Sequence, residues 1–253
     1  MTRLNRSLGV LRSLAVYHGI PWRSRQLRTF YRAFIPPGGL AFDIRAPAGN
    51  RTAAWRRLGA RVVAVEPQPD FVRLLHGLFD HDDGVTVLPL ALGREAGSAR
   101  LLRSERTPTV STLSDDFVRR AGASASFRGV QWAPGPTVEV ATLDTLLAGF
   151  GRPDFVKIDV EGYEHEVLGG LSEPLPALSF EYLAPVRDVA LACIDRLEAL
   201  GRYRYQASAG ERLRWLQPEP LDAAAMRDWL AGLGPEAPSG DIYARLVGPG
   251  GTA

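Results

Sequence analysis

The chain has 253 residues, and its shares of hydrophobic (45%) and charged (23%) residues are ordinary for a soluble globular protein of one α/β domain or two small ones. No apolar run reaches the roughly 18 residues of a membrane-spanning helix, so no transmembrane segment is expected. The single cysteine, Cys193, excludes an internal disulfide and a cysteine-rich metal cluster. Its apolar helical surroundings favour a buried, unreactive thiol, and a reducing, cytoplasmic location fits this cysteine usage.

The formal net charge of +2 hides an uneven distribution of charge along the chain. Residues 1–42 contain no Asp or Glu, but they include Arg3, Arg6, Arg12, Arg23, Arg25, Arg28 and Arg32. Such a segment can contact an anionic lipid, glycan or nucleic-acid surface, and it also resembles an organelle transit peptide. Five aromatic residues favour instead a helical lead-in, residues 1–37, that packs on the main domain: Tyr17, Trp22, Phe30, Tyr31 and Phe34.

Hydrophobic spacing predicts helices over 8–17 and about 24–34, the second ending before Pro36-Pro37-Gly38-Gly39. From residue 38 onward, strands and helices alternate. Strands are expected at 40–44, 61–66, 85–92, 154–160, 177–183, 203–208 and 241–247, and a further strand–helix pattern begins at 137. This alternation predicts one α/β domain, residues 38–253, with a doubly wound, mostly parallel, seven-stranded sheet.

The alternation pauses over residues 93–136. The first part of this segment suggests a hairpin or an irregular excursion, and "RRAGASASFRGVQWAPGPT" (119–137) has the small, Gly/Pro-rich composition of a mobile loop. We expect an insertion on the acceptor side of a binding site here.

The stretch "FDIRAPAGNRT" (42–52) reads as a strand end, a turn and a helix start, which is the arrangement of a nucleotide-binding turn. Glu66 follows 23 positions after Asp43, at the end of the next strand. An acid there can accept hydrogen bonds from both hydroxyls of a ribose. The alternatives are a solvated carboxylate and a partner for the start of the next helix.

The stretch "DFVKIDVEGYEHEVL" (154–168) places Asp159 and Glu161 at the carboxyl end of a strand, where open α/β sheets bind ligands. The two acids could hold a cation, orient a substrate hydroxyl or take its proton. Two acids are weak evidence for a metal, and the sequence supplies no convincing ligand set. Glu164 and Glu166, in a first helical turn, are explained by the helix dipole, and His165 is typical of a surface position.

The segments "FDI…GNRT", "VVAVEPQP" and "FVKIDVEGYEHEVLGGL" together resemble the FkbM family of S-adenosylmethionine-dependent methyltransferases over roughly residues 40–185. "KIDVEG" is the specific part, because many class I methyltransferases share the upstream pattern. The resemblance implies a Rossmann-like class I fold, S-adenosylmethionine as methyl donor, and a hydroxyl of a sugar, glycolipid or polyketide as acceptor.

The resemblance would place the methionine moiety near Asp43 and Gly49, the ribose at Glu66, the adenine beside Ala91 and Leu92, and the acceptor near Asp159 and Glu161. Further cofactor-binding candidates in the same turns are Arg45, Asn50, Thr52 and Pro67. The candidates for the general base are Asp159, Glu161, Glu181 and His165.

The turn departs from the family pattern, which has glycine at the position of Arg45 and a small or amide residue at that of Pro47. A side chain at the glycine position costs about 1–2 kcal/mol if the backbone is left-handed, and Pro47 removes a backbone N–H donor. Arg45 could reach the carboxylate of the cofactor's methionine moiety, or its bulk could fill the pocket.

Two other functions compete with an active methyltransferase. A catalytically impaired domain could serve as a binding module through its basic lead-in. A nicotinamide-dependent oxidoreductase would also use Glu66, but it requires a fuller glycine motif and leaves "KIDVEG" unexplained. Nucleic acid is an unlikely partner, because no basic stripe interleaved with aromatic residues appears beyond the N-terminal segment.

Overall fold

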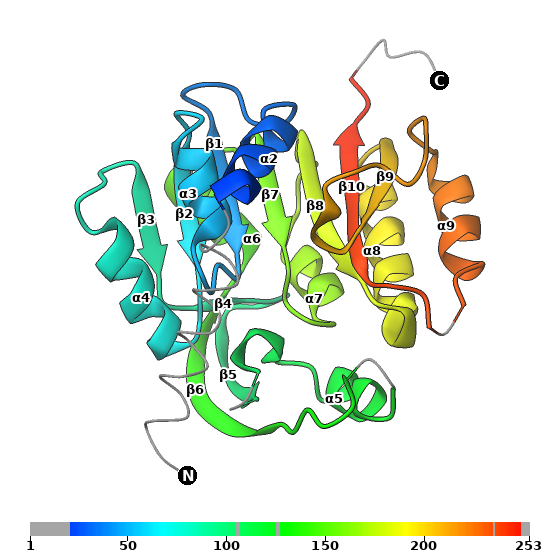
Figure 1. Ribbon diagram of the computed structural model, residues 1–253, viewed down its shortest axis with the longest axis horizontal. Helices are drawn as coiled ribbons and strands as arrows, with labels where there is room; N and C mark the ends of the chain where they lie inside the picture. Colours follow the sequence, from blue (N-terminus) through cyan, green and yellow to red (C-terminus); the bar gives the residue numbers. More distant parts are fainter. Residues whose placement is uncertain (1–20, 105–106, 125–126, 235, 249–253) are drawn as a thin grey trace.

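The computed structural model describes residues 21–104, 107–124, 127–234 and 236–248 (Figure 1). The expected helix over 8–17, Tyr17 and the first three arginines lie outside the described residues. The helices are α2 (Pro21–Tyr31), α3 (Asn50–Arg56), α4 (Pro69–Phe79), α5 (Asp115–Gly122), α6 (Leu143–Phe150), α7 (Glu164–Gly169), α8 (Arg187–Leu200) and α9 (Ala223–Ala231), with short 3-10 turns η1 (Pro108–Val110), η3 (Ala184–Val186) and η4 (Gly210–Arg212). The strands are β1 (Leu40–Ile44), β2 (Arg61–Val65), β3 (Val85–Leu88), β4 (Ala91–Leu92), β5 (Gly97–Arg103), β6 (Ala133–Ala141), β7 (Phe155–Ile158), β8 (Ala177–Tyr182), β9 (Tyr203–Ala209) and β10 (Gly240–Leu246).

Seven strands form the central sheet in the order β3-β2-β1-β7-β8-β10-β9. Six of them run parallel, and β10 is antiparallel to both of its neighbours, β8 and β9. The strand order reverses direction between β1 and β7. The carboxyl ends of these two strands therefore form the crevice in which doubly wound sheets bind ligands.

Helices cover both faces of the sheet because its strands are apolar on both faces. Alternate residues of β1 show this: Phe42 packs with the helices α6 to α9, while Ala41 packs with α2 and α3. All five residues of β1 are buried, as expected for a central parallel strand. The predicted α/β class with a mostly parallel seven-stranded sheet is confirmed.

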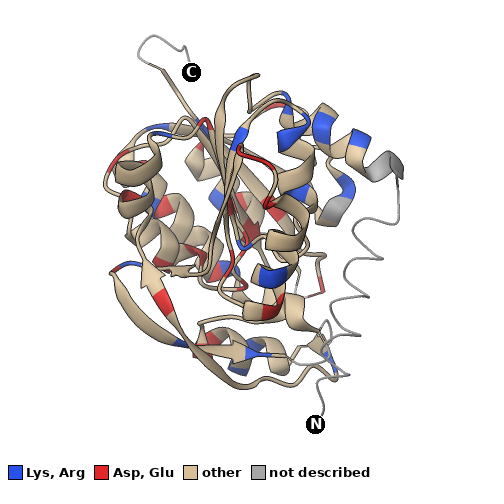
Figure 2. Cartoon of the chain, turned by 90° about the vertical axis from the view of Figure 1, so that its left-hand side faces the viewer, with Lys and Arg blue, Asp and Glu red and all other residues tan. Residues whose placement is uncertain are grey.

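The lead-in helix α2 packs onto the sheet through aromatic side chains. Tyr31 is fully buried, and its ring lies 5.2 Å from that of Trp55 and 5.4 Å from that of Phe155, measured between centroids. Arg25 in the helix and Arg32 in the turn that follows are exposed, and Figure 2 shows basic residues along this helix. Tyr31 thus docks the helix, while Arg25 remains exposed.

Two predicted strands differ from the strands of the structure. The stretch 85–92 is two strands, because Pro89 interrupts the hydrogen-bond ladder and β4 continues in another sheet. The strand expected from residue 137 begins at Ala133 and does not enter the central sheet. It is β6, the middle strand of a three-stranded sheet β4-β6-β5 below the carboxyl ends of the central strands (Figure 1).

The segment expected to be a mobile loop contains regular structure. Helix α5 begins after Ser114, whose Oγ accepts a hydrogen bond of 3.0 Å from the N–H of Phe117. Phe117 is buried against Phe127 and Trp132, with ring centroids 5.4 and 6.0 Å away. Aromatic packing therefore orders this part of residues 93–136.

Candidate active site

The turn after β1 holds Arg45 in a left-handed backbone conformation with φ of 69°. The N–H groups of Arg45 and Ala46 both donate to the carbonyl of Val65, at 2.8 and 3.2 Å, which fixes the turn on the end of β2. The sequence argument for a glycine-like position is therefore confirmed. A non-glycine residue at such a position costs about 1–2 kcal/mol.

The guanidinium of Arg45 lies against the turn that follows β7. Its Nη1 donates to the main-chain oxygen of Asp159 at 3.0 Å and to Oε1 of Glu161 at 3.2 Å. The carboxylate of Asp159 is 3.7 Å from the same nitrogen. Arg45 is 6% exposed, so these charge-assisted contacts lie in a largely dehydrated setting.

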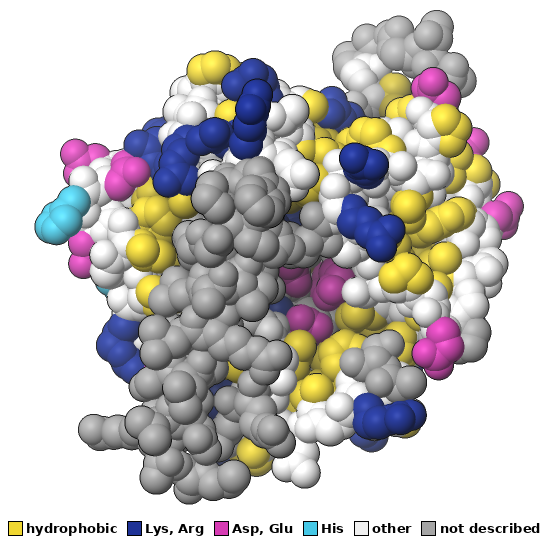
Figure 3. All heavy atoms as spheres, viewed as in Figure 1, with side chains coloured by type: hydrophobic (Ala, Val, Ile, Leu, Met, Phe, Trp, Pro, Cys, Tyr) yellow, Lys and Arg dark blue, Asp and Glu magenta, His cyan; other side chains and the backbone are white. Residues whose placement is uncertain are grey.

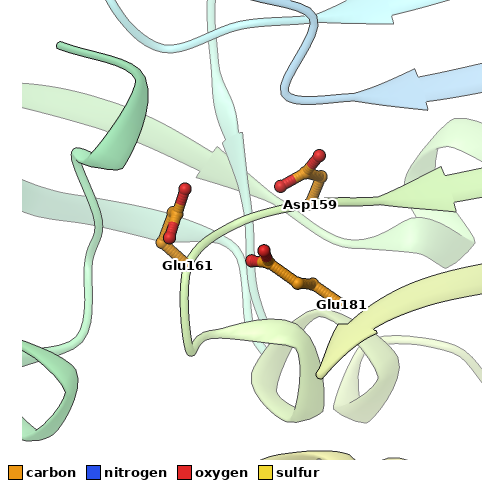
Figure 4. A group of neighbouring side chains, drawn as sticks. All are labelled: Asp159, Glu161 and Glu181. Carbon is orange, nitrogen blue, oxygen red and sulfur yellow. The ribbon is translucent and has the colours of Figure 1, made fainter. Parts of the chain in front are cut away.

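Asp159, Glu161 and Glu181 point toward one another from the end of β7, the following turn and the end of β8 (Figure 4). One carboxylate oxygen from each lies within 4.8 Å of the others. These three acids are the catalytic candidates predicted from the sequence, and the fold brings all three together. Their spacing would also suit a divalent cation, although Arg45 already supplies positive charge to two of them.

Asp159 is the acid most strongly held by cations. Lys157 Nζ donates to Asp159 Oδ2 at 3.2 Å and to Asp241 Oδ1 at 2.7 Å, and Arg51 Nη1 lies 3.7 Å from Asp159 Oδ2. Burial alone would raise the pKa of Asp159, but Lys157, Arg51 and Arg45 together hold that pKa below its usual range. Asp159 is therefore a fixed negative charge and a poor proton acceptor.

For Glu161 and Glu181, unlike Asp159, the increase in pKa caused by burial is larger than the decrease caused by nearby cations. Burial raises the pKa of Glu161 to about 7, although Arg45 acts in the opposite direction. Burial and the neighbouring acids Glu161 and Asp159 raise the pKa of Glu181 well above its usual value. Among the described residues, nothing hydrogen-bonds to Glu181 Oε2.

Glu66, at the end of β2, is fully buried, which rules out the solvated carboxylate considered from the sequence. Its Oε1 accepts a hydrogen bond of 2.9 Å from the N–H of Gln68, the residue that caps α4. Its Oε2 has no hydrogen-bond partner within the described part of the chain. Burial raises the pKa of Glu66 to about 7. One oxygen thus supports the helix start, and the other is an unpartnered buried acceptor.

Two cavities meet at this edge of the sheet. The smaller, about 30 Å³, lies beside the end of β2 and includes Val65, Pro67, Ala91, Leu92 and Tyr163 in its wall. The larger, about 260 Å³, contains Asp159, Glu161 and Glu181. Figure 3 shows acidic side chains inside a hollow near the centre of one face. Among the described residues, Arg45 alone lines both cavities.

Comparison with known proteins identifies the family of this arrangement. The family model described as "Methyltransferase FkbM domain" matches residues 43–185, which is more than half of the chain. The chain belongs to the FkbM methyltransferase family. The chain is therefore one of the S-adenosylmethionine-dependent methyltransferases. Its Rossmann-like class I fold is the one predicted from the family resemblance.

The solved structures similar to this chain include several methyltransferases. An O-methyltransferase from Bacillus cereus in complex with SAH is 12% identical, with 97% of this chain and 92% of that chain covered and a TM-score of 0.47. Precorrin-6y C5,15-methyltransferase from Geobacter metallireducens GS-15 is 14% identical, with 88% and 85% covered and a TM-score of 0.45. A putative O-methyltransferase from Klebsiella pneumoniae is 11% identical, with 94% and 89% covered and a TM-score of 0.46. These similarities are too low to indicate the reaction or ligand of this chain. No match was found among curated proteins.

The FkbM segment contains every residue that lines the two cavities, except Ser239. Its remaining predicted site residues have distinct placements. Thr52 Oγ1 donates to Asp43 Oδ2 at 2.7 Å, so Thr52 holds Asp43, and burial raises the pKa of Asp43 to about 6. Asn50 lines the larger cavity, and its Nδ2 has no partner among the described residues.

Gly49 and His165 lie apart from the cavities. A Cβ on Gly49 would lie 2.8 Å from Cε2 of Phe79, so this glycine makes room for α4 rather than for a cavity. The His165 side chain is 37% exposed, 3.7 Å from Glu166, and lines neither cavity, as its expected surface position requires.

Glu164 has a role that the sequence argument missed. It is 1% exposed, and its Oε1 accepts hydrogen bonds from the N–H groups of Val160 and Gly162, at 3.0 and 3.3 Å. It therefore fixes the turn that carries Glu161, where the helix dipole had seemed a sufficient explanation. The spacing of an acid two residues after Gly162 was the available signal.

The polar atoms around the cavities fit the family's cofactor. Unpartnered buried polar atoms cost about 1–3 kcal/mol each, so Glu66 Oε2, Arg45 Nη2 and Asn50 Nδ2 indicate a ligand with hydroxyl and anionic groups. An adenosyl amino acid has both kinds of group.

Proposed function

We propose that this protein is an O-methyltransferase that transfers the methyl group of S-adenosylmethionine to a hydroxyl of a sugar, glycolipid or polyketide-type acceptor. The observation that carries the proposal is that Arg45 lines two cavities at the ends of β1, β2 and β7, with the unpartnered Glu66 Oε2 near the smaller cavity and three carboxylates in the wall of the larger one. The cofactor when bound would supply an electrophilic methyl group on a sulfonium sulfur.

The acceptor would enter the larger cavity, whose volume of about 260 Å³ approaches that of small-ligand pockets. Thr109, Val110 and Phe127 contribute to its wall, which supports the proposal that residues 93–136 form an acceptor-side insertion in the domain 38–253. Holding the acceptor oxygen in line with the methyl carbon and sulfur can supply about 7–11 kcal/mol of catalysis.

Among the three acids, we assign Glu161 as the proton acceptor. Its pKa, raised to about 7 by burial, lies near neutral pH, and its carboxylate lines the larger cavity. Glu161 would accept the hydroxyl proton of the acceptor during methyl transfer. Asp159 remains ionised and orients the turn through Arg45 and Lys157, and Glu181 hydrogen-bonds the acceptor.

The experiment is methyl transfer from isotope-labelled S-adenosylmethionine to a panel of sugars, a glycolipid and a polyketide lactone, with mass spectrometry locating the label. Glu161→Gln is expected to lower kcat about 10²- to 10⁴-fold, the usual contribution of a general base. The exposed Glu139→Gln is the matched control and should keep full activity. Label on a nitrogen, or equal rates for Glu161→Gln and the control, would refute these assignments.

The alternative function is a catalytically impaired methyltransferase domain that serves as a binding module. It is supported by the small volume of the cavity beside Ala91 and Leu92 and by the position of Arg45 between the two cavities. Calorimetry separates the two functions. The enzyme should release or absorb heat on titration with S-adenosylmethionine. A protein that gives no signal with millimolar S-adenosylmethionine but binds anionic vesicles would be a module.

The outer face of α2 supports a second, independent proposal about partners. Arg25 in the helix and Arg32 in the turn that follows are exposed, and residues 21–42 contain no acid, so this segment can contact an anionic surface (Figure 2). No described helix is long and apolar enough to cross a bilayer.

We also propose a cytoplasmic location, which the buried free thiol of Cys193 supports.

A further inference from the structure

Several backbone donors of the turn between β1 and α3 are already engaged or absent. The N–H groups of Arg45 and Ala46 are both bonded to Val65, the N–H of Gly49 donates to Ala46 at 3.2 Å, and Pro47 has none. Side chains of this turn therefore become important donors for a ligand anion.

Two side chains of this turn carry donors for such an anion. Arg45 Nη2 and Asn50 Nδ2 are buried and have no hydrogen-bond partner among the residues that the structure describes. Both residues line the 260 Å³ cavity, and Arg45 is 94% buried. Unmet donors are costly in a buried setting, and a guanidinium is suited to binding a carboxylate with two parallel hydrogen bonds.

The same cavity contains charges of both signs. Asp43, Asp159, Glu161 and Glu181 line it together with Arg45, Arg51 and Asn50. A ligand part that carries one ammonium and one carboxylate can find an opposite charge for each group in such a cavity. The amino-acid end of an adenosyl amino acid is a zwitterion of this kind.

We propose that Arg45 is a cofactor-binding residue: its guanidinium holds the carboxylate of the cofactor's methionine moiety, in the place of the backbone contacts that a glycine turn would make. Asn50 Nδ2 is the second donor. This inference rests on the proposed use of S-adenosylmethionine and concerns one residue of the site.

Because Arg45 lies between the cavities, a contact with the cofactor carboxylate also affects the acids that Arg45 holds. In the structure described here, Nη1 holds Glu161 at 3.2 Å and the Asp159 carbonyl at 3.0 Å. A carboxylate that draws the guanidinium toward itself weakens the hold on Glu161, which then becomes available to the acceptor. Cofactor binding thus prepares the acid that faces the acceptor.

The test compares two ligands that differ only in the carboxylate, S-adenosylmethionine and decarboxylated S-adenosylmethionine, by calorimetry. The wild-type protein is expected to bind the complete cofactor at least about tenfold more tightly, the usual effect of a charge-assisted hydrogen bond. In Arg45→Gln the ratio of the two affinities should fall to about one. Arg45→Lys should keep part of it, and the exposed Arg94→Gln, which pairs with Glu166, should keep all of it.

The outcomes are distinguishable. Because the ratio is measured within each variant, a general loss of stability affects both ligands alike. Equal affinities in the wild-type protein would overturn the inference while leaving cofactor use intact. Tighter binding of both ligands by Arg45→Gln would also overturn it, since the guanidinium would then be filling the pocket. Binding of neither ligand by the wild-type protein would refute the proposed function itself.

Discussion

Arg45 Nη1 and Glu161 Oε1 lie 3.2 Å apart, and each belongs to a residue with a positive φ, 69° and 56°. The two strained turns, after β1 and after β7, thus face each other and are joined by one buried ion pair. Strain of this kind persists only where surrounding contacts over-determine it, and it concentrates at functional sites. The pair lies where the two cavities meet.

Replacing Arg45 by glycine should destabilise the protein in a pH-dependent way. The substitution relieves about 1 kcal/mol of backbone strain, but it leaves Glu161 buried without its cation, which costs about 3 kcal/mol when the carboxylate is ionised. Since the pKa of Glu161 is already about 7 and rises further without Arg45, the acid is protonated at pH 5.5 and partly ionised at pH 8. The loss of unfolding free energy should therefore be larger at pH 8.

Urea denaturation of Arg45→Gly at the two pH values measures this difference. Arg94→Gln removes an exposed ion pair and should lose less than about 1 kcal/mol at both. An equal loss at pH 5.5 and pH 8 for Arg45→Gly would mean that Glu161 does not respond to the guanidinium.

Glu66→Gln should weaken cofactor binding and should make the protein more stable than the wild type above neutral pH. Unfolded glutamate loses its proton near pH 4.5, whereas folded Glu66 keeps its proton up to about pH 7. The folded state binds more protons in this window, so the unfolding free energy of the wild-type protein falls by about 3 kcal/mol for this group as the pH rises through it. Glutamine does not titrate, so the variant should lack that decline.

The same variant should bind S-adenosylmethionine about tenfold more weakly, because the amide nitrogen cannot accept a hydroxyl hydrogen bond. Unfolding titrations from pH 4.5 to pH 8, together with calorimetry, test both effects, with Glu139→Gln as the exposed control. A variant with unchanged affinity would remove Glu66 from the ribose site.

Some features of the site could be predicted from the sequence alone. Asp159 and Glu66 stand at strand ends, and a parallel sheet brings its strand ends to one edge, so their proximity could be predicted. The positive φ of Arg45 was also predictable, because a family glycine marks the position. These inferences need local patterns and one topological rule.

The partners of these residues could not be predicted in the same way. Arg45 pairs with Glu161, 116 positions away, and Lys157 donates to Asp241 as well as to Asp159. The pairs of Arg45 with Glu161 and of Lys157 with Asp241 depend on the side-chain packing of separate strands, and no local pattern encodes them. Helix α5 was missed for a different reason: Ser114 and the following acids form a helix start, but the Gly/Pro-rich surroundings concealed it.

Gly162→Ala should be strongly destabilising, because this glycine allows α5 to pack on the turn after β7. Its φ is 81°, and an added Cβ would lie 2.8 Å from Cβ and Cδ2 of Phe117. We expect a loss of about 2–4 kcal/mol from overpacking and strain together. The matched control is Gly149→Ala in α6, where a Cβ meets nothing within 4 Å and should add about 0.5–1 kcal/mol of stability. Equal effects of the two substitutions in urea titrations would show that α5 does not pack on this turn.

Methyl transfer should be insensitive to chelation of divalent metals, although three carboxylate oxygens lie within 4.8 Å of one another. Arg45 occupies the position of a counter-cation for Asp159 and Glu161, and Lys157 and Arg51 add further positive charge to Asp159. A divalent ion would have to displace the guanidinium to gain three ligands, and the repulsion between the two cations opposes this. We therefore expect equal initial rates with EDTA and with millimolar Mg²⁺ or Mn²⁺. A rate that falls with EDTA and returns on addition of one of these ions would show that the three acids bind a metal, and Arg45→Gln should then bind that metal more tightly than the wild-type protein.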